Sequence, residues 1–160
     1  MRKLRIYLET TVFNYYFDEE RDEHPATVKL FNEIKDGKFE AVTSTLVVKE
    51  LAATKDEERR NKLLGLIEKC GIRVLEHVNE TIQKLAEYYI HEKIIPTSSR
   101  NDAMHIATAT FYELDCIISM NFSHINKYKT KVLVARNNAV LGYTKVLDIC
   151  SSWEVVEYED

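Results

Sequence analysis

Four polar residues in this sequence stand at the edges of apolar runs: Glu9, Glu50, Asp102 and Asn121. Apolar runs of this kind fold into buried strands and helices, so these polar groups are expected at element ends. Carboxylate and amide oxygens gathered at strand ends are typical ligands of hard cations. A bound Mg²⁺ or Mn²⁺ would favour chemistry on phosphate, because the metal polarises a phosphoryl oxygen and activates water. We therefore take these four residues as candidate catalytic and metal-binding residues.

The elements that must position these residues follow from the spacing of apolar side chains. Strands are expected at residues 4–8, 39–43, 72–75 and 115–119, with later strands at 131–134 and 145–149 and an edge strand at 153–158. Helices are expected at residues 24–35, 56–70 and 79–93, and others begin near residues 45 and 101. Strands that alternate with helices indicate a single-domain three-layer α/β/α sandwich with a central, mainly parallel sheet. One domain spanning residues 1–160 is the simplest interpretation, since no linker or internal repeat is visible.

The order of these elements indicates where the four polar residues meet. Glu9 and Asn121 each follow a predicted strand, and the hydroxyls after Glu9 can cap the next helix. Asp102 opens a helix, and Glu50 lies about one turn into another. Ligands of open parallel sheets bind beyond the carboxyl ends of the strands. We expect all four side chains at that edge, although the sequence gives their order and not their distances.

Four segments carry a resemblance to a known family. They are residues 6–12 (IYLETTV), 43–51 (TSTLVVKEL), 101–109 (NDAMHIATA) and 115–125 (DCIISMNFSHI). In this order the chain resembles the PIN domain family, especially the VapC-like toxin ribonucleases of toxin–antitoxin pairs. The resemblance covers nearly the whole chain, and its specificity comes from the four segments together, because each motif alone is weak.

The resemblance implies a metal-dependent ribonuclease. Glu9, Glu50 and Asp102 would hold one or two Mg²⁺ or Mn²⁺ ions, Asn121 would orient a water, and Thr10 and Ser119 would hydrogen-bond ligand carboxylates or a phosphate. It also implies an RNA substrate, a homodimer and an antitoxin protein as partner. Two positions depart from the family pattern, in which the first and fourth acidic residues are usually Asp. Glu9 adds a methylene there, and Asn121 supplies a neutral oxygen, which lowers the charge of the site.

Each candidate also has a purely structural interpretation. Asp102 suits a helix N-cap or a first-turn acid, Glu50 an exposed helical acid, and Asn121 a turn. Only Glu9, at a strand end, is hard to explain by packing. His105 lies among core positions and is expected to be a hydrogen-bonded core histidine.

Other side chains near the proposed edge could contact RNA. Residues 15–17 (YYF) could stack on bases, although a core or dimer-interface stripe is the simpler interpretation. Lys49, Arg100 and Lys127 could contact phosphate. The simpler interpretation is that they are surface charges surrounded by water. His124 could lie at the surface or on the substrate side of the site.

Composition excludes several classes of protein. With 45% hydrophobic residues, 4 Gly and 2 Pro, the chain is neither disordered nor of low complexity. No apolar run is long enough to cross a bilayer and the start lacks a signal-peptide pattern, so we expect a cytoplasmic protein without a membrane contact. The net charge of −4 is a poor footprint for holding nucleic acid by charge alone, but bound cations would offset clustered carboxylates.

Three other functions were weighed against the sequence. The main alternative is a non-catalytic PIN-like module that binds RNA or protein and has a degenerate metal site. A phosphoryl-accepting receiver fits poorly, because Glu9 is followed by Thr10 and not by a second acid. A dinucleotide-binding enzyme is disfavoured, since no glycine-rich turn follows the first strand.

Overall fold

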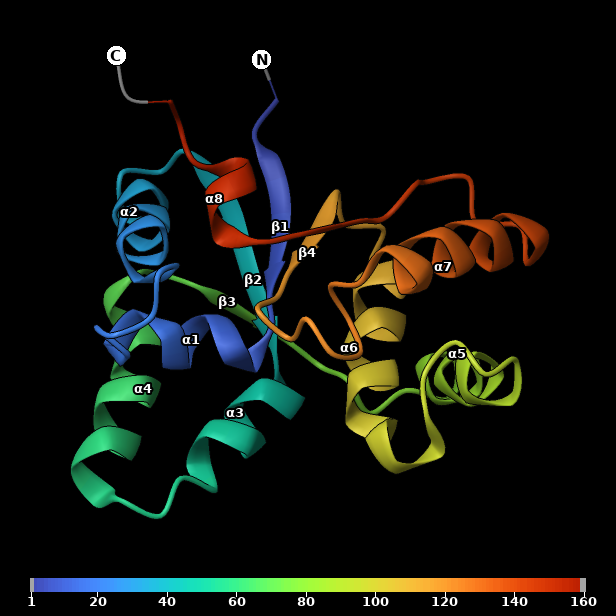
Figure 1. The fold of residues 1–160 in the computed structure, drawn as a ribbon, viewed down its shortest axis with the longest axis horizontal. Helices are drawn as coiled ribbons and strands as arrows, with labels where there is room; N and C mark the ends of the chain where they lie inside the picture. The colour runs from blue at the N-terminus through green and yellow to red at the C-terminus, as the bar shows by residue number, and fades with distance from the viewer. Residues whose placement is uncertain (1, 159–160) are drawn as a thin grey trace.

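A five-stranded sheet forms the centre of the molecule (Figure 1). The computed structural model describes residues 2–158. The strands are β1 (Leu4–Leu8), β2 (Phe39–Ser44), β3 (Arg73–Leu75), β4 (Cys116–Ile118) and β5 (Asp148–Cys150), in the spatial order β3-β2-β1-β4-β5. Every pair of neighbouring strands is parallel. All carboxyl ends therefore point to the same edge, as the site prediction requires.

Helices cover both faces of this sheet (Figure 1). One face carries α1 (Thr10–Phe17), α2 (His24–Lys35), α3 (Thr45–Ala52), α4 (Glu57–Lys69) and α8 (Ser152–Val155). The other carries α5 (Glu80–His91), the short helix η1 (Thr97–Ser99), α6 (Arg100–Phe111) and α7 (Tyr128–Val140). This arrangement confirms the predicted single-domain α/β sandwich with a central parallel sheet. Within residues 2–158, no helix combines the length and apolar character needed to cross a membrane.

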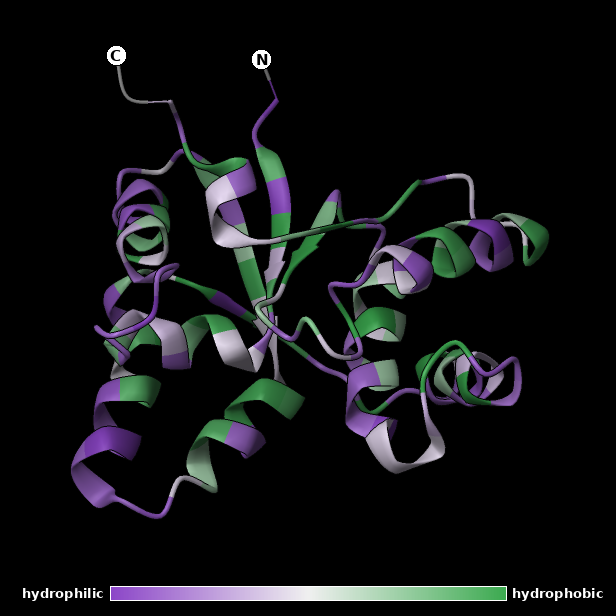
Figure 2. Cartoon of the chain, in the orientation of Figure 1, coloured by the Kyte–Doolittle hydropathy of each residue, from purple (hydrophilic) through white to green (hydrophobic). Residues whose placement is uncertain are grey.

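The core lies on both sides of β1. Ile6, Tyr7 and Leu8 are fully buried in succession, because a strand between two helical layers has no face toward water. Figure 2 shows the same contrast in colour, with hydrophobic residues on the central strands and hydrophilic ones on the outer parts of helices such as α4. Burial on both faces explains why β1 is a continuous apolar run and does not alternate.

Side chains at helix starts fix where the chain leaves the sheet. Ser44 caps α3 through its hydroxyl, and Asn79 caps α5 by accepting the N–H groups of Thr81 and Ile82. At α1 the cap is the Glu9 carboxylate, which accepts the N–H of Thr11 at 3.2 Å. The expected hydroxyl cap at this helix was wrong: the acid itself satisfies the exposed N–H group.

Two predicted strands are helical in the structure. Residues 131–134 lie inside α7, where Thr130, Val134 and Asn138 are the buried positions. Their spacing of four is the period of a helix face, which a short apolar run cannot reveal by itself. Residues 153–158 contain α8 followed by irregular chain, because Ser151 and Glu154 form a capping box that starts a helix. The strand expected at residues 145–149 is β5, which has only three residues and begins at Asp148.

Candidate functional site

The four candidate residues lie along the carboxyl edge of the sheet. Glu9 follows β1 directly, and Asn121 lies three residues after β4. Glu50 comes from α3, which follows β2, and Asp102 lies in the first turn of α6. Figure 1 shows the starts of α1 and α3 beneath the carboxyl ends of β1 and β2, with α6 beside them. The parallel topology thus delivers segments far apart in sequence to one region.

The Glu9 carboxylate is buried and fully engaged with protein donors. Only 3% of the residue is exposed. Its Oε1 atom accepts hydroxyls from Thr11 at 2.5 Å and from Ser119 at 2.6 Å, while Oε2 accepts the Thr11 N–H. Burial raises the pKa of Glu9, against the charge of His105 and these hydrogen bonds, which lower it. Glu9 therefore joins α1 to the end of β4, whatever else it does.

Glu50 is held by residues from two other elements. Its Oε1 atom accepts the Thr10 hydroxyl at 2.6 Å and lies 2.6 Å from Nε2 of His105. Burial alone would raise the pKa of Glu50, but the hydrogen bond and charge of His105, with the Thr10 hydroxyl, outweigh it and the pKa is lowered. Glu50 is therefore an oriented carboxylate and not an exposed helical acid.

His105 connects this carboxylate to the core. The ring is fully buried, and its Nδ1 atom lies 2.7 Å from the Tyr7 hydroxyl, which lies 2.7 Å from the Ser44 hydroxyl. Burial disfavours the charged ring, but the hydrogen bond to Glu50 and the negative charges of Glu50, Glu9 and Asp102 raise the pKa of His105. Three carboxylates from three elements thus act on one buried imidazole. The expectation of a hydrogen-bonded core histidine agrees with this geometry.

Asp102 and Asn121 meet at His124. The Oδ2 atom of Asp102 lies 3.1 Å from Nδ1 of His124, and this nitrogen also lies 3.1 Å from the Ser99 hydroxyl. Asn121 accepts the backbone N–H of His124 through its side-chain oxygen at 3.1 Å, which is a turn-stabilising contact. Asp102 makes no cap bond at the start of α6, where Ser99 is the N-cap residue.

As a donor set, the four residues fit a hard divalent cation, because all offer oxygen atoms. Within residues 2–158, however, no three His, Cys, Asp or Glu side chains lie close enough together to form a metal centre by themselves. Both Glu9 oxygens already accept protein hydrogen bonds. Glu50 and Asp102 meet their histidines through one oxygen each, Oε1 and Oδ2. In donor chemistry, Glu50 and Asp102 are therefore the stronger candidate ligands.

The basic and aromatic candidates divide between surface and core. Arg100 pairs with Glu87 at 2.9 Å, and Tyr16 packs on Phe31 with ring centroids 5.1 Å apart. These two side chains are accounted for by structural contacts. Lys127 instead lines a hollow beside His124.

Sequence reasoning expected Thr10 and Ser119 to hydrogen-bond carboxylates, and they donate to Glu50 and Glu9. It did not identify the histidine partners of the acids. The contact of His105 with Glu50, that of His124 with Asp102 and the position of Tyr7 behind His105 were all missed. All three contacts join residues far apart in sequence, which no local pattern reveals.

Comparison with known protein families matches residues 6–129 to the PIN domain. This range includes all four candidate residues and ends at the start of α7. PIN domains are generally metal-dependent nucleases, and PIN nucleases act on RNA. No curated protein matches the chain.

Proposed function

Because the chain belongs to the PIN domain family, we propose that it is a ribonuclease that hydrolyses RNA phosphodiester bonds with Mg²⁺ or Mn²⁺. One observation carries the proposal within this chain: the carboxylates of Glu9, Glu50 and Asp102 lie along the carboxyl edge of the sheet, and each is held in place by side chains from other segments. The carboxyl edge of a parallel sheet is where ligands bind in folds of this class, and oriented acids at that edge are candidates for a functional site.

The residues take distinct roles in this proposal. Asp102 and Glu50 would hold the metal, with Glu9 and Asn121 completing the site directly or through water. When bound, the metal supplies Lewis acidity toward the phosphate. Thr10 and His105 fix the direction of the Glu50 carboxylate, and Ser119 does the same for Glu9. Carboxylates oriented in advance lose less conformational entropy when they bind a cation.

Metal-dependent cleavage of RNA tests the proposal. Purified protein is incubated with a pool of structured and unstructured RNA in Mn²⁺ or Mg²⁺, beside an EDTA control. Asp102→Asn should abolish cleavage because it removes a charged ligand while keeping the shape of the side chain. Asp148→Asn is the matched control, since Asp148 is exposed at the amino end of β5, on the opposite edge of the sheet.

Two results would contradict this proposal. If folded Asp102→Asn protein, verified by circular dichroism, cleaves as fast as wild type, the assigned roles are wrong. Cleavage that persists in EDTA would remove the metal from the proposal.

A non-catalytic module that binds RNA or protein is the second candidate. The engagement of both Glu9 oxygens with protein donors favours it, because those oxygens are then committed to holding α1 and β4 together. Calorimetric titration with Mn²⁺ distinguishes the two functions. Absence of both metal binding and cleavage would support the module.

The biological setting that we propose follows the sequence resemblance. The protein is a cytoplasmic, single-domain VapC-like toxin spanning residues 1–160, which forms a homodimer and is inhibited by an antitoxin protein. Light scattering on the purified protein tests the dimer, for which the mass should be twice that of the chain. Co-purification with the product of a small neighbouring gene, and inhibition of cleavage by it, would test the antitoxin.

A further inference from the structure

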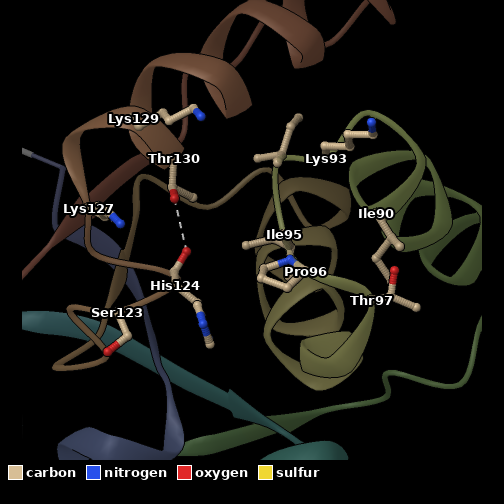
Figure 3. A pocket seen from close by; sticks show the side chains of 11 residues that line it. Ile90, Lys93, Ile95, Pro96, Thr97, Ser123, His124, Lys127, Lys129 and Thr130 are labelled. Carbon is tan, nitrogen blue, oxygen red and sulfur yellow. Dashed lines mark hydrogen bonds between the residues drawn. The ribbon is translucent and has the colours of Figure 1, made fainter.

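A hollow of about 250 Å³ lies beside His124, between the chain that leaves α5 and the start of α7. Its floor is apolar and includes the buried residues Ile94 and Ile95. Three lysines stand around it: Lys93 on one side, Lys127 and Lys129 on the other (Figure 3). The volume is below the ~300–1,000 Å³ of pockets for drug-sized ligands, so it suits a small group and not a whole nucleotide.

The positive charges of the three lysines around this hollow are not neutralised by ion pairs within the described residues. Lys93, Lys127 and Lys129 are exposed, and none has an ion pair with any residue in the range 2–158. Lys62 and Lys84, in contrast, each pair with a glutamate one helical turn away. Three ammonium groups around one concave surface repel one another, and an anion placed between them removes that repulsion.

The start of α7 adds to the same preference. No side chain caps this helix, and its first turn holds no acidic residue but does include Lys129. A helix N-terminus favours anions and disfavours cations, so lysines placed there cost stability unless an anion is bound. The preference of the hollow for an anion rests mainly on the three unpaired lysines, and the helix end adds to it.

One residue joins the hollow to the candidate active site. His124 lines the hollow, and its ring lies 3.1 Å from the Asp102 carboxylate. The buried Thr130 hydroxyl donates to the His124 carbonyl at 3.0 Å and so fixes the loop that carries this histidine (Figure 3). An anion in the hollow would therefore lie close to the metal and the phosphate that Asp102 is proposed to bind.

We propose that Lys93, Lys127 and Lys129 form a subsite for a backbone phosphate of the RNA substrate, adjacent to the phosphate that is cleaved. This inference rests on the proposed function for the identity of the anion. The subsite reads charge and not base identity, because ammonium groups contact phosphate in every sequence alike. It also explains how a chain of net charge −4 holds RNA, since the cations are concentrated at one point.

RNA binding measured without cleavage tests the subsite. A 5′-fluorescein-labelled single-stranded oligoribonucleotide is titrated with protein in EDTA, and anisotropy gives Kd at several salt concentrations. The variant Lys93→Gln/Lys127→Gln/Lys129→Gln should weaken binding by about tenfold, equally for different RNA sequences. The slope of log K against log salt should fall by about 0.7 for each phosphate that the variant no longer neutralises.

A matched variant controls for the change in net charge. Lys3, Lys35 and Lys69 are exposed and precede β1, β2 and β3, so they lie at the amino edge of the sheet, away from the site. The variant Lys3→Gln/Lys35→Gln/Lys69→Gln should keep Kd within about twofold and leave the salt slope unchanged. Equal weakening by the two triple variants would overturn the subsite.

Failure of the subsite and failure of the nuclease proposal give different results. If wild-type protein cleaves RNA in Mn²⁺ while the pocket variant binds and cleaves like wild type, only the subsite is wrong. If wild-type protein binds RNA through the three lysines but never cleaves it, the subsite stands and the nuclease proposal fails. Where both hold, the pocket variant should raise KM with little change in kcat, because the lysines bind ground state and transition state alike.

Discussion

The Glu50 carboxylate of the candidate site is held by a hydroxyl from α1 and an imidazole from α6. Neither partner belongs to its own helix, so the direction of Glu50 depends on three elements at once. Hydrogen bonds behind a ligand fix its geometry and are generally needed for full metal affinity. The Thr10 hydroxyl is the partner whose removal disturbs the core least, because Thr10 is only half-buried.

Thr10→Val should therefore lower Mn²⁺ affinity or cleavage by about 10–100-fold, with little change in stability. The substitution keeps the branched shape of the side chain and removes only the donor. Isothermal titration with Mn²⁺ and a cleavage assay measure the effect. Thr81→Val, at an exposed position in α5, provides the control. Unchanged metal affinity in Thr10→Val would separate Glu50 from metal binding.

Asp115 is a second oriented acid, at the opposite edge of the sheet. It accepts the N–H of Arg5 at 2.7 Å and pairs with Arg2 and Lys145. Burial would raise the pKa of this carboxyl, but the Arg5 N–H, Lys145 and Arg2 outweigh it and lower the pKa to about 2. The folded state therefore holds the charged form at pH values where an unfolded aspartate, with pKa about 3.9, has begun to bind a proton.

Asp115→Asn should reduce the free energy of unfolding by roughly 1–3 kcal/mol at pH 6, because charged hydrogen bonds are removed. The wild-type advantage is fully present above about pH 4 and should disappear as the pH falls toward 2. Urea denaturation at pH 6, 4 and 3 measures the difference between the two proteins. The exposed Asp22→Asn should show no such convergence. A difference that stays constant down to pH 3 would contradict the assignment.

At the scale of elements, helix starts were more predictable than late strands. The helix His24–Lys35 has the predicted bounds, because its apolar spacing is regular and Asp36-Gly37 ends it. The strand predicted at 131–134 is wrong because three consecutive apolar residues, at 132–134, fit either a strand or a helix, and only packing against the rest of the protein decides. The capping box at Ser151 was visible in the sequence and outweighed the alternation that follows it.

The site was predictable to the level of elements and no further. Parallel strands place Glu9 and Asn121 at one edge, which follows from chain order alone. Thr10 was expected to hydrogen-bond a carboxylate, but which one does not follow from the sequence, because Thr10 and Glu50 are 40 residues apart. The contact of Asp102 with His124, 22 residues apart, was not expected at all. Side-chain pairing across such separations depends on how helices are rotated in the fold, which local spacing does not determine.

Asn79 offers a test of the element scale away from the site. Asn79→Ala should lower the free energy of unfolding by about 0.5–2 kcal/mol, because two N–H groups of α5 lose their acceptor. Asn61→Ala, at an exposed position inside α4, should instead be neutral or slightly stabilising, since alanine is the better helix former. Urea denaturation measures both. Equal effects in the two variants would show that capping does not control this helix.

At the scale of the whole molecule, β1 connects the two halves of the sheet. It pairs with β2 on one side and with β4 on the other. Ile6 lies in the middle of this strand and is fully buried, whereas Leu4 at its start is 45% exposed. The two positions therefore separate the contribution of packing from that of strand formation.

Ile6→Ala should cost about 2–5 kcal/mol of unfolding free energy, because buried apolar surface is removed and a cavity remains. Leu4→Ala in the same strand should cost within about 0.5 kcal/mol, because its side chain is largely in water. Chemical denaturation of both variants provides the measurement. Similar destabilisation at the two positions would mean that strand propensity, and not burial, dominates in β1.

The central position of β1 also has a consequence for synthesis of the protein. Its register pairs Ile6 with Cys116, so the strand made first must wait for one made 110 residues later. At about 5–20 residues per second, a ribosome takes on the order of 5–20 s to make that stretch. Until then one edge of β1 has no partner, and Glu9 lacks the Ser119 hydroxyl that holds it. The nascent chain therefore completes its acidic edge only when most of the polypeptide has been made.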